Sequence, residues 1–435
     1  MTCLTCPSGE NITNAKSFSP WVYVTYDCSC RCPYCMIPDM SCAGDKTMSP
    51  ETFRKMLEIT EKLFEKGVYE QAHFRLSGGE PFLVFNNYKD IVTEYRKKYP
   101  SKMFFGMLTN FVVFNDEIAD WMEENSIGMQ VSIDDLVNSK PLVSGKSSSE
   151  LVLSNIQKLQ TRNISFSFNT VLDIEKTQDL TKLANFVSSF NNIEWGLNAS
   201  YTDKDASKVE QVIKIFDACI FQLVKRGFDI NRRLRFYNTT IGTGRGGCSA
   251  GISSFGLGTN LELWPCQSWC DRDPIGYFDE NIKETLKTAP GNEFFRTERK
   301  LAKCSECPVV GQCRGGCRAT HEDDEINDAV CQIRRDIIGK LGLGYYYTRN
   351  NQQCNCNSNQ QRNNQCRQCN NACNNACNSQ CQQCNNACNN QACTSPANSI
   401  ECHDHGDGIN TIVDDYISKL PDKKDAMLVD TPDLE

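Results

Sequence analysis

The sequence predicts an α/β protein: a partial (β/α)6, TIM-like barrel followed by a Cys-rich domain and a low-complexity tail. Three observations support this prediction. From about residue 20 to 200, short β-rich runs alternate with amphipathic helical runs, the pattern of parallel βα units. A Gly- and Cys-rich segment follows at about 240–345. Beyond it the chain consists mostly of Asn, Gln and Cys.

Six β-rich runs supply the expected barrel strands, at residues 21–25, 73–76, 103–108, 129–133, 165–171 and 193–197. The helical runs between them include SPETFRKMLEITEKLFEKG, in which Ser49 can cap the helix and Pro50 suits its first turn. A helical connector, SKVEQVIKIFDACIFQLVKRG, follows the sixth unit, with apolar residues at helical spacing. Six such units would form an incomplete barrel.

These changes of pattern divide the chain into six parts. They are an N-terminal extension (1–19), the barrel (20–201), the helical connector (202–240), the Cys-rich domain (241–345), the Asn/Gln/Cys-rich tail (346–403) and an acidic C-terminal segment (404–435). The Cys-rich domain has few long periodic elements, so we expect metal sites to hold it together. The tail has very few large apolar side chains and cannot bury a core.

Composition narrows the class of protein. The formal net charge is -8, which argues against a nucleic-acid partner because phosphate binding needs a basic surface. We find no apolar run long enough to span a bilayer and no apolar signal core at the start, so we expect a cytoplasmic protein without a membrane partner. In a reducing compartment, 27 cysteines favour metal ligation over disulfides. Only four histidines are present, which favours thiolate-only sites such as iron-sulfur clusters over mixed zinc sites.

Three cysteines directly follow the first expected strand in the segment YDCSCRCPYC: Cys28, Cys32 and Cys35. Three thiolates on a four-iron cluster leave one iron without a protein ligand and open to a small molecule. We expect Cys30, inside the motif, not to be a ligand. A structural zinc knuckle is the alternative interpretation, but it would need a fourth ligand close by.

The second motif, LSGGEP, ends the second expected strand at residues 76–81. Gly78 and Gly79 permit close approach of backbone to a ligand, and Glu80 can accept hydrogen bonds from an ammonium group. Read alone, the motif indicates an ordinary turn before Pro81. One βα unit after the three-cysteine loop, it is expected at the same end of the barrel, the face where such barrels keep their active sites.

Both motifs resemble the signature of the radical S-adenosylmethionine (SAM) superfamily. The resemblance implies a 4Fe-4S cluster on the three cysteines, and an electron from that cluster that cleaves SAM to a hydrogen-abstracting 5′-deoxyadenosyl radical. The SAM contacts that it implies are Gly78, Gly79, Glu80, Pro81, Asn110, Ser132 and Asp134. Strand-end capping is an alternative role for each of the last three.

A downstream set of cysteines resembles the SPASM extension of radical SAM enzymes that modify peptides and proteins. The resemblance implies two auxiliary 4Fe-4S clusters, an outer one on Cys304, Cys307, Cys313 and Cys331 and an inner one on Cys248, Cys266 and Cys317. Either Cys270 completes the inner cluster or one iron stays open. Leu261 stands where the family often has Gly, which weakens the turn there.

The resemblance implies a maturase of a peptide or protein substrate, supplied with electrons by a flavodoxin- or ferredoxin-type donor. Residues 354–402 hold 11 cysteines and repeat the unit NNAC. Some family members form thioether crosslinks at such repeats, so the tail is either a substrate in cis or a solvated segment or metal sink, and the sequence leaves these alternatives open. Two rival functions are an anaerobic sulfatase maturase, which makes formylglycine, and an iron-sulfur electron-transfer or metal-storage protein. The sequence does not identify the catalytic residues.

Overall fold

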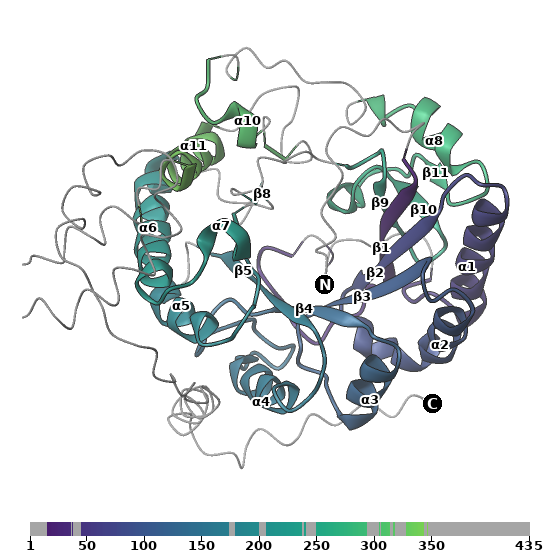
Figure 1. Cartoon of the computed structure of the whole chain (residues 1–435), viewed down its shortest axis with the longest axis horizontal. Coiled ribbons are helices and arrows are strands. Elements are labelled where there is room, and N and C mark those ends of the chain that lie inside the picture. The colour runs from purple at the N-terminus through teal and green to yellow at the C-terminus, as the bar shows by residue number, and fades with distance from the viewer. Residues whose placement is uncertain are drawn as a thin grey trace, which may run out of the picture.

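The computed structural model describes residues 15–35, 37, 45–173, 179–199, 206–236, 239–240, 249–293, 304, 306–313, 316–317, 328–342 and 346. Their strands form one sheet, which curves around the centre of the molecule with helices on its outside (Figure 1). The strand order in this sheet is β11-β10-β9-β1-β2-β3-β4-β5-β6-β7-β8.

Successive strands from β1 to β7 pair in parallel. They are β1 (Ser17–Thr25), β2 (Gln71–Gly78), β3 (Met103–Thr109), β4 (Gly128–Ser132), β5 (Phe166–Leu172), β6 (Trp195–Ala199) and β7 (Leu234–Phe236). The six predicted strands and the partial barrel are therefore confirmed. β7 and the short antiparallel β8 (Thr239–Thr240) add to them, within the segment expected to be a helical connector. Because parallel strands share one direction, the loops that follow them meet at one rim of the barrel.

The outer layer consists of helices that connect these strands (Figure 1). They are α1 (Pro50–Glu65), the 3-10 helix η1 (Pro81–Asn87), α2 (Lys89–Lys98), α3 (Asp116–Glu124), α4 (Ser149–Leu159), α5 (Leu180–Ser188), the 3-10 turn η2 (Ala206–Lys208), α6 (Val209–Lys225) and α7 (Ile230–Arg233). The predicted start of α1 is confirmed, since the Ser49 side chain accepts a hydrogen bond from the Thr52 amide and Pro50 lies in the first turn.

Apolar residues on the inner faces of these helices pack against the sheet. Phe168 in β5 lies against Phe186 and Phe190 of the α5 segment, with ring centroids 5.9 and 5.3 Å away. Burying a side chain of this size contributes about 1.5–3 kcal/mol. A polar chain inside this core aligns three strands: Trp195 donates to the Thr170 hydroxyl at 2.8 Å, and Thr170 donates to the Ile133 carbonyl at 2.6 Å.

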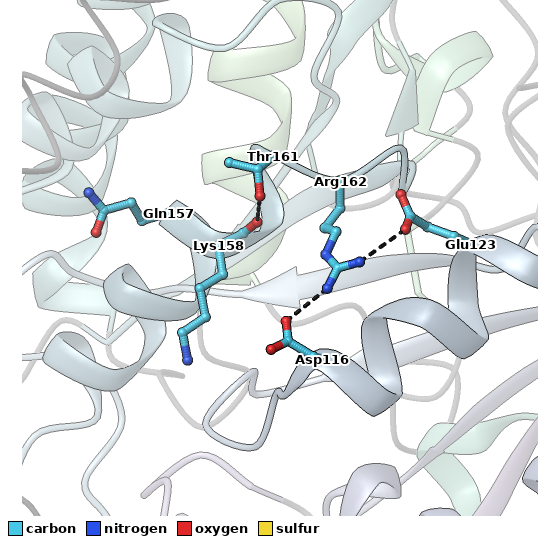
Figure 2. A pocket seen from close by; sticks show the side chains of 6 residues that line it. All are labelled: Asp116, Glu123, Gln157, Lys158, Thr161 and Arg162. Atoms are coloured by element: carbon cyan, nitrogen blue, oxygen red, sulfur yellow. Dashed lines mark hydrogen bonds and ion pairs between the residues drawn. The ribbon is translucent and has the colours of Figure 1, made fainter.

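Charged side chains link α3 to the end of α4 on the outer surface (Figure 2). Arg162 binds Asp116 at 2.8 Å, Asp120 at 2.6 Å and Glu123 at 3.4 Å. A surface pocket here is lined by Asp116, Glu123, Gln157, Lys158, Thr161 and Arg162. None of these residues belongs to the site predicted from sequence, and such exposed ion pairs contribute little to stability.

The Cys-rich domain extends the barrel sheet beyond β1. β9 (Ser254–Leu257) pairs in parallel with β1, and β10 (Glu262–Trp264) and β11 (Gly276–Tyr277) follow antiparallel. This domain also contains the 3-10 turn η4 (Gln267–Trp269) and the helices α8 (Ile282–Thr288), α10 (Val310–Cys313) and α11 (Asp328–Gly342). The 15-residue α11 is the one long element among those described in this segment. It packs on α6, where Lys340 and Tyr346 each contact the Asp217 carboxylate at 2.7 Å.

Leu261 lies in the turn between β9 and β10 with φ +66°. This left-handed conformation is ordinarily adopted by Gly and costs a Leu residue roughly 1–2 kcal/mol. Leu261 thus adopts the conformation that Gly favours, and the reduced stability of the turn stays a prediction. The Leu261 side chain is buried in the main core, which offsets the cost.

No helix in the described part of the chain is both long and apolar enough to cross a membrane.

Candidate active site

The loop that follows β1 carries the three thiols predicted to bind a metal cluster. Cys28, Cys32 and Cys35 are partly exposed, whereas Cys30 is buried. A hydrogen bond from Cys30 lowers the pKa of Cys28, which favours the thiolate form. Burial raises the pKa of Cys32 to about 11. Within the described ranges, no three Cys, His, Asp or Glu side chains converge on the position of a single metal ion.

Backbone contacts hold this cysteine loop against the segment that follows β4. Cys30 pairs with Leu142 in an antiparallel bridge. Next to it, the Arg31 amide donates to the Pro141 carbonyl at 2.7 Å. The conformation of the cysteine loop therefore depends on β1, which it follows, and on the segment that follows β4.

Gly78 and Gly79 bring the end of β2 against the base of the cysteine loop. The Gly79 amide donates to the Thr25 carbonyl and the Glu80 amide to the Asp27 carbonyl, both at 2.8 Å. A Cβ on Gly78 would lie 2.0 Å from the Thr25 oxygen, and one on Gly79 would lie 2.0 Å from the Asp27 oxygen. Gly78 also has φ +139°, which side chains disfavour. The close approach expected of these glycines is thus made to the backbone that carries the thiols.

Glu80 joins the ends of β2 and β3 from a fully buried position. One carboxylate oxygen accepts from the Thr109 hydroxyl at 2.7 Å and the other from the Asn110 amide at 2.8 Å. Burial raises the pKa of Glu80 to about 8, against the opposing effect of these hydrogen bonds. Each carboxylate oxygen can accept more than one hydrogen bond, so capacity remains for a further donor.

Asn110 connects β3 directly to the cysteine loop. Its Nδ2 lies 3.4 Å from Cys28 Sγ and 3.3 Å from the Ser29 hydroxyl. Its Oδ1 accepts from the Val112 amide at 3.0 Å, which is the strand-end capping considered for it above. Asn110 therefore caps its own turn and also contacts the Cys28 thiol, while its contact with SAM stays a prediction.

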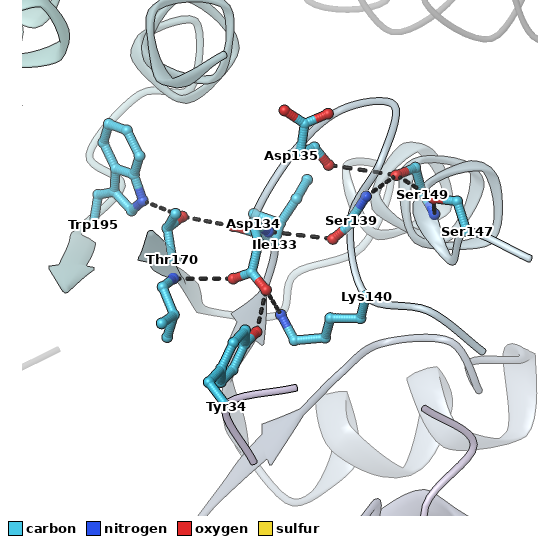
Figure 3. A network of polar contacts seen from close by, with 11 residues as sticks. Tyr34, Ile133, Asp134, Asp135, Ser139, Lys140, Ser147, Ser149, Thr170 and Trp195 are labelled. Atoms are coloured by element: carbon cyan, nitrogen blue, oxygen red, sulfur yellow. Dashed lines mark hydrogen bonds and ion pairs between the residues drawn. The ribbon is translucent and has the colours of Figure 1, made fainter. Parts of the chain in front are cut away.

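Asp134 lies just beyond β4, in a buried polar network (Figure 3). One oxygen of its carboxylate accepts from the Val171 amide at 3.0 Å. The other binds the Lys140 ammonium at 2.7 Å and the Tyr34 hydroxyl. Ser132 is the last residue of β4 and is partly buried. Lys140 belongs to no motif in the sequence, and its spacing from the cysteines gives no signal that would have identified it.

Cys266 and Cys270 lie on either side of η4, beside β1. Both are buried. Cys266 Sγ accepts from the Ser268 amide at 3.4 Å, and Cys270 Sγ lies 3.4 Å from the Tyr23 hydroxyl. Two of the predicted auxiliary ligands thus contact or adjoin the strand that leads to the cysteine loop.

The remaining predicted ligands lie near α10 and α11, except Cys248, which is outside the described residues together with the tail. The partly buried thiols of this group are those of Cys304, Cys307, Cys313, Cys317 and Cys331. Cys313 ends α10, which packs against α11, the helix that carries Cys331. Cys307 and Cys313 also pack against the main core.

The chain combines a partial parallel barrel, three cysteines after β1 and a Gly-Gly-Glu-Pro turn after β2. Together these features define a class of enzyme. Residues 22–187 match the Radical SAM superfamily, and this part of the chain is a radical SAM domain.

Known relatives extend beyond this domain. A cysteine-type anaerobic sulfatase-maturating enzyme from Clostridium novyi (strain NT) is 22% identical over 323 residues, which cover 68% of this chain and 86% of that enzyme. Native anSMEcpe with bound AdoMet and the Cp18Cys peptide has TM-score 0.58 and 15% identity, over 76% of this chain and 99% of that one. Streptococcus suis SuiB bound to precursor peptide SuiA has TM-score 0.55 and 13% identity, over 74% and 77%. The two structures show that the fold is shared.

We predict that Gly79→Ala disrupts the cysteine loop, because the new Cβ would overlap the Asp27 carbonyl. The free energy of unfolding should fall by roughly 3 kcal/mol, measured by chemical denaturation, and iron retained per chain after anaerobic reconstitution should fall with it. Gly106→Ala in β3 is the matched control, since the nearest atom to its Cβ is 3.7 Å away. Equal iron content and stability in the two variants would contradict this interpretation.

Proposed function

We propose that this chain uses a 4Fe-4S cluster on Cys28, Cys32 and Cys35 to cleave SAM and modify a peptide or protein. One observation carries the proposal: the ionisable Cys28 thiol, Asn110 and the glycine turn before Glu80 meet at one end of the radical SAM domain. Soft thiolates are the ligands that iron-sulfur clusters prefer, so the donor set fits the group. When bound, the cluster would supply the electron that cleaves SAM to a 5′-deoxyadenosyl radical.

The side chains around the cysteine loop would bind and orient the co-substrate. Glu80 would accept hydrogen bonds from its amino group, and the Gly78–Pro81 turn would lie beside that group. Asn110, Ser132 and Asp134 lie at the same rim of the barrel, at the ends of β3 and β4. The buried position of Glu80 keeps water away from this contact and strengthens it.

Two further clusters would occupy the auxiliary cysteines, with Cys270 the candidate fourth ligand of the inner one. Cys266 and Cys270 are both buried and separated by a single 3-10 turn, which suits ligands of one group. The outer cluster would lie at α10 and α11. An external reductant of the flavodoxin or ferredoxin type would supply the electrons.

A Cys-rich peptide is the substrate that we favour, with thioether crosslinks as the product. The tail supports this choice, because its cysteines repeat at short spacing and it is joined to the enzyme, which raises its local concentration. Formylglycine formation is the second candidate. The similarity to a sulfatase-maturating enzyme along 86% of that enzyme's length supports it.

Replacing Cys28, Cys32 and Cys35 together by Ala should abolish 5′-deoxyadenosine formation from SAM and a strong reductant, because no ligands would hold the cluster. Liquid chromatography of the quenched reaction gives the measurement. Cys219→Ala is the control, since Cys219 is buried in α6 away from this loop. Undiminished cleavage by the triple variant would disprove the proposed function.

The affinity for SAM should rise with pH between 6 and 7.5. Burial raises the pKa of Glu80 to about 8, so its carboxyl is mostly protonated in this range and must release a proton to accept from an amino group. The gain is at most about tenfold per pH unit. Calorimetric titrations of the reconstituted protein in two buffers would count the proton. Glu80→Gln should bind more weakly and lose this proton release, and proton uptake by the wild type would rule the mechanism out.

Intact-mass analysis of the reacted tail, or of an added peptide with the same repeat, should distinguish the two substrates. Crosslinking removes two hydrogen atoms per bridge and blocks alkylation of the thiols concerned. Formylglycine instead gives an aldehyde that hydrazides trap. If both the tail and the added repeat peptide keep their mass while 5′-deoxyadenosine accumulates, Cys-rich repeats are not the substrate.

A further inference from the structure

Lys140 and Asp134 form an ion pair that is almost completely removed from solvent. Their side chains are only 8% and 5% exposed, and Lys140 Nζ lies 2.7 Å from Asp134 Oδ2. The Arg54–Glu94 pair on the outer helices, by comparison, is 41% and 51% exposed. Taking two charges out of water costs several kcal/mol per ion, and their mutual attraction often fails to offset this cost. A contribution to stability therefore does not by itself explain why the chain buries this ion pair.

Tyr34 of the cysteine loop lies against this ion pair (Figure 3). Tyr34, which stands between Cys32 and Cys35 in the sequence, donates to the same Asp134 oxygen as Lys140. The backbone next to Lys140 is tied to the loop as well, since the Pro141 carbonyl accepts from Arg31 at 2.7 Å. Both the ammonium group and the backbone next to it are thus tied to the cysteine loop.

The charge of Lys140 reaches the cysteine loop through a short chain of contacts. Asp134 Oδ2 lies 2.7 Å from Lys140 Nζ and also accepts from the hydroxyl of Tyr34, a residue of the loop itself. A positive charge held in a buried place stabilises negative charge nearby more strongly than it would in water. A 4Fe-4S cluster on three thiolates becomes more negative by one charge when it accepts an electron.

We propose that Lys140 raises the reduction potential of the cluster on the cysteine loop, with Asp134 and Tyr34 as the positioning residues that hold its ammonium group. Asp134 also moderates the effect, because its negative charge partly cancels that of Lys140. This inference rests on the proposed cluster site. It assigns Asp134 a role through Lys140 rather than a direct contact with SAM.

The test is a redox titration of the reconstituted full-length chain without SAM, followed by electron paramagnetic resonance. The signal of this cluster is identified by its absence from the variant that lacks Cys28, Cys32 and Cys35. Lys140→Met should lower the midpoint potential and Asp134→Asn should raise it. At the wild-type midpoint, each should change the ratio of reduced to oxidised cluster at least tenfold, which corresponds to 59 mV for one electron.

Further variants separate charge from packing. Lys140→Arg keeps the charge and should stay near the wild-type potential, and the Lys140→Met/Asp134→Asn double variant should lie between the two single variants. Tyr34→Phe changes no charge and should move the potential less than either. Lys98→Met is the matched control, because Lys98 pairs with Glu61 on the outer helices.

Shifts of the same sign in Lys140→Met and Asp134→Asn, or no shift in either, would overturn the inference. If Lys140→Met does not fold, Lys140→Gln removes the same charge with a polar side chain and takes its place in the comparison. A wild-type chain that binds no iron at Cys28, Cys32 and Cys35 refutes the proposed function and this inference with it. A cluster that is present but insensitive to these substitutions refutes only the inference.

Discussion

The close contact between the end of β2 and the start of the cysteine loop is the constraint on which the rest of the site depends. Neither Gly78 nor Gly79 leaves room for a Cβ, because the carbonyl oxygens of Thr25 and Asp27 would lie 2.0 Å from it. Two backbone hydrogen bonds close this contact. This contact fixes where the cysteine loop starts, and the contacts of Cys30 and Arg31 with the segment after β4 hold the loop further along.

Buried polar groups then join neighbouring strand ends around the mouth. Glu80 links β2 to β3, Asn110 links β3 to the cysteine loop, and Asp134 links the region after β4 to β5 and to Tyr34. Each of these groups would be costly to bury without partners. Together they hold neighbouring strand ends in a defined arrangement through buried, paired polar groups, which is how a scaffold preorganises functional side chains.

Much of this structure could be predicted from the sequence. The six barrel strands and the Ser49 cap follow from local patterns that depend on few neighbours. The placement of Gly79 and Glu80 beside the cysteines follows from chain order, because successive parallel strands end at one rim. The Lys140 ion pair could not be predicted, since it depends on how the loop after β4 folds back. The pairing of β9 with β1 could not be predicted from the sequence either. A four-residue strand gives too short a pattern, and its partner lies more than 200 residues away in the chain.

The pairing of β9 with β1 has a consequence for how the chain can be divided. β1 pairs with β2 on one side and with β9 on the other. The strand that covers the outer edge of β1 is therefore supplied by the Cys-rich segment. A fragment that ended after β7 would leave one side of β1 with unpaired amides and carbonyls. Such an exposed strand edge can pair with strands of other chains and cause aggregation. The two segments are consecutive in sequence, and their strands belong to one continuous sheet.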